Sequence, residues 1–182
     1  MFSLPRILHV LDSHTKKWKK SRVFYFKEAF YMKLREEMPT FDGVTEWVNG
    51  GVTKSDLKDS PVLVHYWSIS CHTCKETLPQ LNEWRERYKD QGLRVVSIHM
   101  PRSEKDMELG PVKEAIEQYK LIHPVAIDND YKLVDAYKNQ YVPAYYLFDT
   151  EQKLRHYQAG EKGLKMLEKR LDRVLMPEEV ER

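Results

Sequence analysis

Hydrophobic and polar positions become regular from about residue 40 of this 182-residue chain. Two runs rich in β-branched and aromatic residues, 62–67 and 93–100, predict buried strands. Between them, apolar residues recur at near-helical spacing from Cys71 to about Gln91. We expect Pro79 to kink this helix and Gly92 to end it. Residues 111–121 follow the pattern of a second amphipathic helix.

The second half of the chain predicts shorter elements. We expect a short strand in 123–128, a short helix in 131–140, and two strands in 143–149 and 153–160 joined by a DTEQ turn. A last helix carries an apolar stripe from Leu164 to Leu175. The early β–α–β units require parallel strands with right-handed crossovers, and the late turn requires an antiparallel hairpin. We therefore predict an α/β fold, a mixed β-sheet with helices on both faces.

The chain divides into one domain and two flanking segments. We assign residues 1–39 to a basic, aromatic N-terminal extension, residues 40–176 to the domain and residues 177–182 to a frayed tail. Residues 1–31 hold seven Lys or Arg and two Asp or Glu, a local charge of +5, and Met32 would also serve as a domain start. We expect a mobile or weakly helical extension, and binding to a membrane surface remains the alternative.

Composition narrows the class of protein. The net charge of +2 gives no global field that points to nucleic acid, and no run approaches the roughly 20 apolar residues of a membrane-spanning helix. The apolar run 7–11 is short and interrupted by His9, and no cleavage site of the A-x-A type follows it. We therefore expect a cytoplasmic protein.

The two cysteines, Cys71 and Cys74, lie in the stretch WSISCHTCKETLP. Cys71 falls where a strand passes into a helix, and the free N–H groups and dipole of a helix N-terminus favour a thiolate. Cys74 follows one turn later, near enough to close a small disulfide ring, and we expect it to be the more buried, resolving thiol. His72 and Lys75 add local positive charge. This arrangement favours thiol–disulfide exchange.

Metal binding is the weaker interpretation of the same residues. Structural zinc requires four ligands, and Cys71, Cys74 and His72 supply three at most. Copper handling and an inert cysteine pair also remain open, and we expect no bound metal or cofactor.

The segment VLVHYWSISCHTCKETLPQLNEW resembles the thioredoxin-like domains of the TlpA group, in particular the domain attached to DipZ-type membrane proteins. The resemblance continues through GLRVVSIHMP, HPVAIDNDY, NQYVPAYYLFD and a final GE, and covers roughly residues 40–175. It implies a thioredoxin-like fold and a thiol–disulfide oxidoreductase. Such an enzyme would act on a disulfide in a protein or small molecule and receive electrons from another dithiol protein. In a reducing cytoplasm it would serve as a reductase.

The resemblance also implies site residues. Pro143 falls where these folds carry a cis-proline beside the disulfide, and Val142 would offer backbone hydrogen bonds to a substrate strand. Trp67 would pack beside the thiols, with plain core packing as its alternative role. We group His72, between the two thiols, with these substrate-contacting residues. A trans proline that opens an edge strand is the alternative for Pro143.

Two histidines are candidates for the chemistry. His65 lies where many thioredoxins have a buried aspartate that moves the proton of the second thiol, and a neutral imidazole could do the same. Packing in the core is the alternative. His99 ends the second strand, at the sheet edge that leads to Cys71, and is either part of the site or an exposed loop residue. Many TlpA-like proteins have glutamate at the position of Thr77, so acid–base help from there is not expected.

Two other functions remain as alternatives. Peroxiredoxins share this architecture, so a thiol peroxidase is one, although Trp-Ser-Ile-Ser precedes Cys71 where that chemistry places threonine and proline. The other is a non-catalytic carrier of metal or thiol groups.

Overall fold

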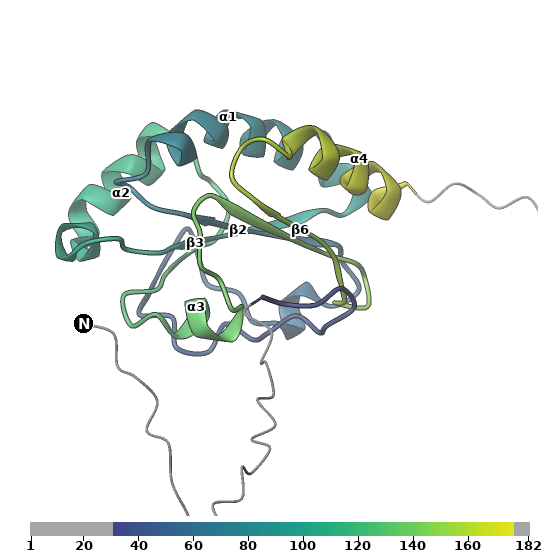
Figure 1. Cartoon of the computed structure of the whole chain (residues 1–182), viewed down its shortest axis with the longest axis horizontal. Helices are drawn as coiled ribbons and strands as arrows, with labels where there is room; N and C mark the ends of the chain where they lie inside the picture. The colour runs from purple at the N-terminus through teal and green to yellow at the C-terminus, as the bar shows by residue number, and fades with distance from the viewer. Residues whose placement is uncertain (1–30, 177–182) are drawn as a thin grey trace, which may run out of the picture.

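A six-stranded mixed sheet forms the centre of the computed structural model, which describes residues 31–176 (Figure 1). The strand order is β1-β4-β3-β2-β5-β6. Strands β2, β3 and β4 run parallel, while β1, β5 and β6 pair antiparallel with their neighbours. The strands are Glu46–Val48, Val62–Trp67, Arg94–His99, Val125–Ile127, Ala144–Phe148 and Leu154–Ala159. The predicted mixed sheet is confirmed, and β1 is an additional strand.

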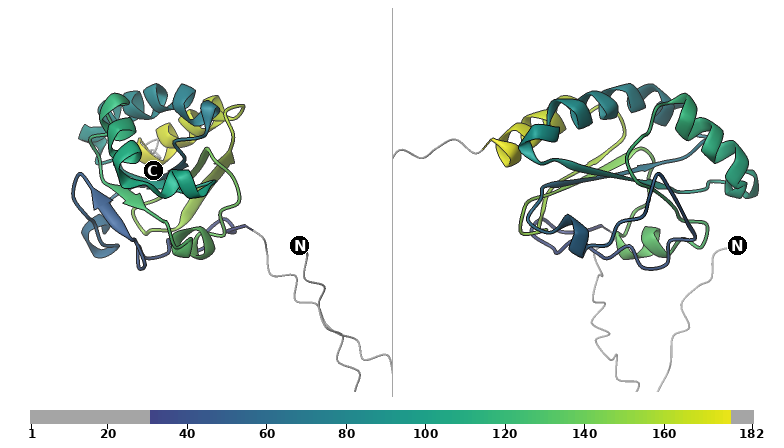
Figure 2. Two further views of the ribbon diagram at one scale, coloured as in Figure 1. Left: turned by 90° about the vertical axis from the view of Figure 1, so that its left-hand side faces the viewer. Right: turned by 180° about the vertical axis from the view of Figure 1, so that it is seen from behind.

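Helices cover both faces of this sheet, as predicted. Helices α1 (His72–Arg87), α2 (Leu109–Gln118) and α4 (Leu164–Leu175) lie on one face, and α3 (Lys132–Ala136) lies on the other (Figure 1). Figure 2 shows the same layers from the side and from behind. Three short 3-10 helices complete the described part of the chain: Ser55–Leu57, Lys89–Gln91 and Glu104–Met107.

The helix boundaries differ from the sequence prediction by a few residues. Helix α1 contains Pro79 and ends at Arg87. The 3-10 helix after it is capped by Gly92, whose φ of 83° favours glycine. Helix α2 begins at Leu109, two residues before Pro111. Pro111 therefore lies in the first turn of the helix, where proline is tolerated. Helix α3 has five residues and is shorter than the predicted segment 131–140.

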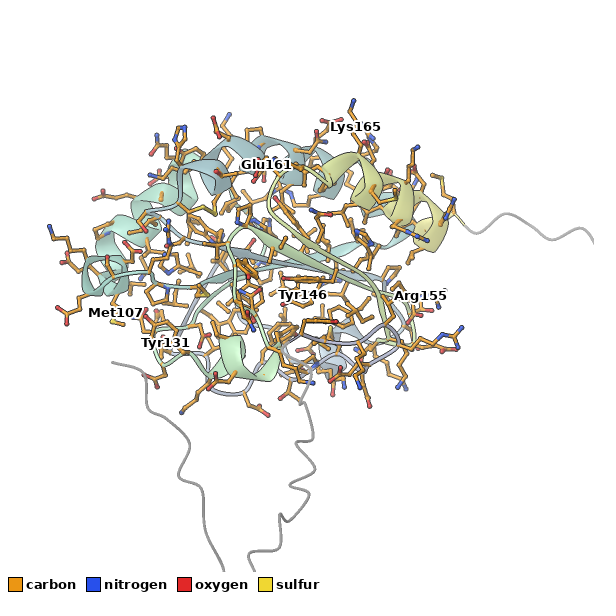
Figure 3. All side chains as sticks on the ribbon, viewed as in Figure 1. Met107, Tyr131, Tyr146, Arg155, Glu161 and Lys165 are labelled. Carbon is orange, nitrogen blue, oxygen red and sulfur yellow. A yellow bond between two sulfur atoms is a disulfide. The ribbon has the colours of Figure 1, made fainter. Side chains whose placement is uncertain are left out.

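Each face of the sheet has its own hydrophobic core. Because side chains alternate along a strand, β2 directs Leu63 and Trp67 toward the face covered by α1, and Val64 and Tyr66 toward the opposite face. Figure 3 shows Tyr146 of β5 in this second layer, where its ring packs against Tyr66. The same alternation places His65 on the face of β2 that α1 covers.

The N-terminal boundary of the domain lies earlier than residue 40. Met32 and Met38 are buried in the core on the α3 side, and the backbone N–H of Arg35 donates to the carbonyl of Leu154 at 2.8 Å. Residues 32–39, assigned above to the extension, therefore belong to the folded domain. Our expectations for residues 1–30 and 177–182 lie outside the described residues. Within 31–176, no helix combines the length and the apolar character needed to cross a membrane.

Candidate active site

The two cysteines form a disulfide at the start of α1. Cys71 is the N-cap residue of this helix, and its sulfur accepts a hydrogen bond of 3.1 Å from the backbone N–H of Cys74. The two Cα atoms are 5.3 Å apart. Cys74 has no exposed surface, whereas 4% of Cys71 is exposed. The pair is thus asymmetric, with Cys71 at the open helix end and Cys74 one turn inside.

Val142 and Pro143 lie beside this disulfide. The peptide bond between them is cis, and the Val142 carbonyl oxygen is 3.7 Å from the sulfur of Cys71. The carbonyl of Pro143 accepts a hydrogen bond from the N–H of Gly160 at 2.8 Å, which ties this segment to the end of β6. The fold therefore brings together two segments that are 71 residues apart in the sequence.

Trp67 and His72 occupy very different environments near the disulfide. Trp67 is fully buried in the same hydrophobic cluster as both cysteines. The side chain of His72 is 86% exposed, and its Nε2 lies 3.3 Å from a carboxylate oxygen of Glu76. Trp67 thus packs in the core with the two cysteines, while the side chain of His72 faces solvent.

His65 is fully buried and held by two neighbours. Its Nδ1 lies 3.2 Å from the hydroxyl of Ser97, and its ring stacks on Tyr145 with 4.9 Å between centroids. Its Nε2 is buried without a hydrogen-bond partner among the described residues. Burial, followed by the nearby His123, lowers the pKa of His65 to about 3. His65 is therefore a neutral imidazole at physiological pH.

His99 is buried rather than exposed, so the interpretation of it as an exposed loop residue is wrong. It pairs in register with Trp67, and the two rings meet edge to face at 5.3 Å. Its Nε2 accepts a hydrogen bond of 3.3 Å from the N–H of Ile69, two residues before Cys71. Burial lowers the pKa of His99 to about 4, although Asp106 acts in the opposite direction. His99 thus supports the loop that carries Cys71.

Asp106 is a site residue that the sequence analysis missed. One of its carboxylate oxygens accepts hydrogen bonds from Ser70 at 2.6 Å, from Ser68 at 3.0 Å and from the backbone N–H of Arg102 at 2.9 Å. Burial opposes its ionisation, but these hydrogen bonds prevail and lower the pKa of Asp106. Asp106 anchors the Ser-Ile-Ser loop immediately before Cys71. Nothing in the sequence pattern identifies it, since it lies in a short 3-10 helix for which the sequence analysis predicted no element.

Thr77 takes the position at which many TlpA-like proteins have glutamate. Its hydroxyl donates to the carbonyl of Cys74 at 2.9 Å and accepts from the hydroxyl of Tyr145 at 3.0 Å. Both groups are neutral and buried, so this position stabilises the first turns of α1 and supplies no carboxylate. In the part of the chain that the structure describes, no three His, Cys, Asp or Glu side chains gather as metal ligands.

Comparison with known proteins agrees with this geometry. The model of the AhpC/TSA family matches residues 34–157. The chain is 53% identical over 145 residues to the thiol-disulfide oxidoreductase YkuV of Bacillus subtilis. This alignment covers 79% of this chain and 97% of YkuV. It is 33% identical to protein DipZ of Mycobacterium tuberculosis over 68% of this chain and 18% of DipZ.

The solved structures agree as well. A thioredoxin-like protein in the oxidized form, solved in solution, superposes with a TM-score of 0.73 at 52% identity, over 79% of this chain and 97% of that chain. The predicted thioredoxin-like fold and the resemblance to the DipZ-type domain are both confirmed. The chain belongs to the AhpC/TSA family and, within it, to the thioredoxin-like thiol–disulfide oxidoreductases.

Proposed function

We propose that this oxidoreductase works as a reductase, in which Cys71 attacks a disulfide of a protein or small-molecule substrate and Cys74 resolves the product. The observation that carries the proposal is the asymmetry of the pair. Cys71 caps the open N-terminus of α1, and Cys74 is fully buried one turn later. Helix N-termini favour thiolates, and the thiolate is the attacking species in disulfide exchange.

The reaction consists of two exchanges. The Cys71 thiolate attacks one sulfur of the substrate disulfide, forms a mixed disulfide and expels the other sulfur as a thiolate, which takes up a proton. The Cys74 thiol loses its proton and attacks the sulfur of Cys71, which releases the second substrate sulfur as a thiolate that is then protonated. The substrate gains two electrons and two protons, and the Cys71–Cys74 disulfide forms. A partner dithiol protein then restores the reduced pair, without a cofactor.

The surface beside Cys71 suits an extended substrate segment. The carbonyl of Val142 lies next to the sulfur of Cys71 and is available to a backbone N–H of the substrate, while Pro143 holds the segment in place. His72, next to Cys71 in the sequence, is exposed to solvent and would contact the substrate. Trp67 supports the cysteines from the core and would act on the substrate only indirectly.

We further propose that the protein acts in the cytoplasm. Its two cysteines both belong to the redox pair, and a reducing compartment would keep that pair in the dithiol form that a reductase requires. Fractionation of cells that express the full chain, with a cytoplasmic and a secreted marker, tests this location.

Reduction of insulin, with dithiothreitol as electron donor, tests the activity. We expect the wild-type protein to accelerate insulin precipitation and Cys71→Ser to lose this effect. Consumption of hydrogen peroxide is measured in parallel, because a thiol peroxidase would consume peroxide rapidly and reduce insulin poorly. Rapid peroxide consumption without insulin reduction would overturn the proposal in favour of the peroxidase.

A further inference from the structure

The side chain of Asn139 is buried next to the segment that carries the cis peptide bond. This residue is 3% exposed and follows α3 in the chain. Its backbone N–H donates to the carbonyl of Val134 at 2.9 Å, so the last turn of α3 holds it. Lys138, immediately before it, has a φ of 51°, a left-handed conformation that commonly ends helices. A tightly held turn therefore carries this buried amide.

The amide of Asn139 has a partner for its nitrogen and for its oxygen. Its Nδ2 donates to the carbonyl of Tyr141 at 2.9 Å and to the sulfur of Met100 at 3.6 Å. Its Oδ1 accepts a hydrogen bond of 3.0 Å from the hydroxyl of Tyr146 on β5 (Figure 3). A carbonyl oxygen and a thioether sulfur have no proton to give, so the amide nitrogen must face them. The orientation of the amide is therefore fixed by its neighbours.

These contacts join the two segments that meet at the disulfide. On one side, Asn139 holds the carbonyl of Tyr141, the residue directly before the one whose carbonyl faces the thiol. On the other side, the backbone N–H of Met100 donates to the carbonyl of Trp67 at 2.8 Å, four residues before Cys71. One buried side chain thus contacts both parts of the site through a short path.

We propose that Asn139 is a positioning residue that holds the carbonyl of Val142 beside Cys71, and so enables the enzyme to recognise the backbone of a polypeptide substrate. The Val142 oxygen lies 3.7 Å from the Cys71 sulfur. The next carbonyl, that of Pro143, accepts a hydrogen bond of 2.8 Å from Gly160. The segment 141–143 is therefore held on both sides of the Val142 carbonyl. This inference rests on the proposed reductase function.

The role of Asn139 should depend on the kind of disulfide. A polypeptide has backbone N–H groups that can donate to the Val142 carbonyl, whereas a small disulfide without amides has none. The exchange at the Cys71 sulfur is the same for both. One hydrogen bond contributes a factor of about two to ten in affinity. Loss of the Asn139 amide should therefore weaken the binding of a polypeptide and leave the reaction with a small disulfide nearly unchanged.

Two probes with the same leaving group separate recognition from chemistry. One is a short unstructured peptide whose single cysteine is linked by a disulfide to thionitrobenzoate, and the other is mercaptoethanol linked to the same group. The Cys71 thiolate forms a disulfide with the peptide or mercaptoethanol sulfur. The original S–S bond breaks, and thionitrobenzoate leaves with the electron pair as a coloured thiolate. Stopped-flow absorbance with the reduced full chain gives the half-saturating concentration and the limiting rate.

Asn139→Leu replaces the amide by an apolar side chain of similar size. We expect the half-saturating concentration of the peptide probe to rise about fivefold, while its limiting rate and the rate constant of the mercaptoethanol probe stay within about twofold of wild type. Equal slowing of both probes would overturn the inference, because it would show a general effect on the fold or the thiol. An unchanged reaction with the peptide would also overturn it.

A double variant separates positioning from stability. Asn139→Leu leaves the buried hydroxyl of Tyr146 without its acceptor, which lowers stability. Addition of Tyr146→Phe removes that hydroxyl, so the double variant should unfold at a higher urea concentration than Asn139→Leu and keep the weakened binding of the peptide. If peptide binding recovers together with stability, Asn139 only supports the fold.

The matched control is Tyr137→Phe. It removes the hydrogen bond from Tyr137 to the carbonyl of Pro39 in the same hydrophobic core on the α3 side, and does not touch the segment 141–143. We expect wild-type behaviour with both probes. A wild-type protein that reacts with neither probe would refute the reductase function and this inference with it. A wild-type protein that reacts with both, together with no selective loss in Asn139→Leu, would refute this inference alone.

Discussion

The hydroxyl of Ser70 donates a hydrogen bond of 2.6 Å to the carboxylate of Asp106, across 36 residues of sequence. Because Ser70 immediately precedes Cys71, this contact fixes the position of the proposed attacking thiol relative to the sheet. The same carboxylate also accepts hydrogen bonds from Ser68 and from the N–H of Arg102. One buried side chain thus holds the loop that precedes α1.

Replacing Asp106 should therefore affect both stability and rate. We expect Asp106→Asn to lower the free energy of unfolding by about 1–3 kcal/mol and to slow the attack of Cys71 severalfold, because the Ser68–Ser70 loop loses a charged acceptor. Urea denaturation and stopped-flow reduction of a small disulfide measure the two effects. Glu104→Gln, an exposed carboxylate in the same 3-10 helix, is the matched control and should change neither.

The effect of Asp106 should also depend on pH. Since the pKa of Asp106 is lowered in the folded state, its ionised form adds stability above the unfolded pKa, about 3.9, and this is lost as the pH falls further. The difference in unfolding free energy between wild type and Asp106→Asn should stay constant from pH 7 to 5 and shrink below about pH 4. A constant difference at all pH values would contradict the shift.

Buried histidines should make the protein sensitive to mild acid. Burial lowers the pKa of His65 and His123 to about 3 and that of His99 to about 4, whereas each titrates near 6.5 in the unfolded chain. The unfolded state therefore binds protons that the folded state does not. Stability that is fully present above pH 6.5 should be lost on acidification, at up to about 1.4 kcal/mol per pH unit for each histidine.

Urea titrations between pH 7 and 5 measure this slope, because most carboxylates stay ionised in that range. We expect His123→Gln to reduce the slope by about one proton. An unfolding free energy that does not change between pH 7 and 5 would show that these rings are protonated in the folded protein.

The two cysteines should differ as nucleophiles. Cys74→Ser keeps the thiol at the N-terminus of α1, so we expect it to attack a substrate disulfide and remain trapped as a mixed disulfide. Cys71→Ser leaves a fully buried thiol and should form at least tenfold less adduct at neutral pH. Mass spectrometry of the trapped species provides the measurement. Equal trapping by both variants would show that the order of attack is wrong.

The N-terminal boundary predicts a difference between two shortened chains. One begins at Tyr31 and the other at Thr40, so the second lacks Met32 and Met38, which are buried in the core on the α3 side. We expect the second chain to be less stable by about 3 kcal/mol or more, because burial of large side chains and hydrogen bonds to 152–154 are lost. Thermal and urea denaturation compare the two.

Met38→Ala in the longer chain serves as the control, and it should account for part of the loss. Equal stability of the two shortened chains would restore residue 40 as the start of the domain.

Local patterns along the sequence were sufficient to predict most of the fold. The run of β-branched and aromatic residues in 62–67 and the periodicity after Cys71 depend only on residues close together in the sequence, so they identify a strand, a helix and the junction between them. The same locality places Cys71 at a helix N-terminus and Cys74 one turn later. Strand β1 escaped prediction, because its three residues Glu46–Val48 gain their structure only by pairing with β4.

Other features depend on contacts between distant parts of the chain. Asp106, Ser97 and His123 carry no local pattern, and their roles arise only when the sheet brings them to Ser70 and His65. The sequence alone could place His65 six residues before Cys71, but its contact with Ser97 on β3, and the contact of Ser97 with His123, arise only in the folded sheet. The physical reason is that the periodicity of the sequence indicates which side of a helix or strand is buried. The hydrogen-bond partner of a buried polar side chain depends instead on which distant segments pack together in the tertiary structure.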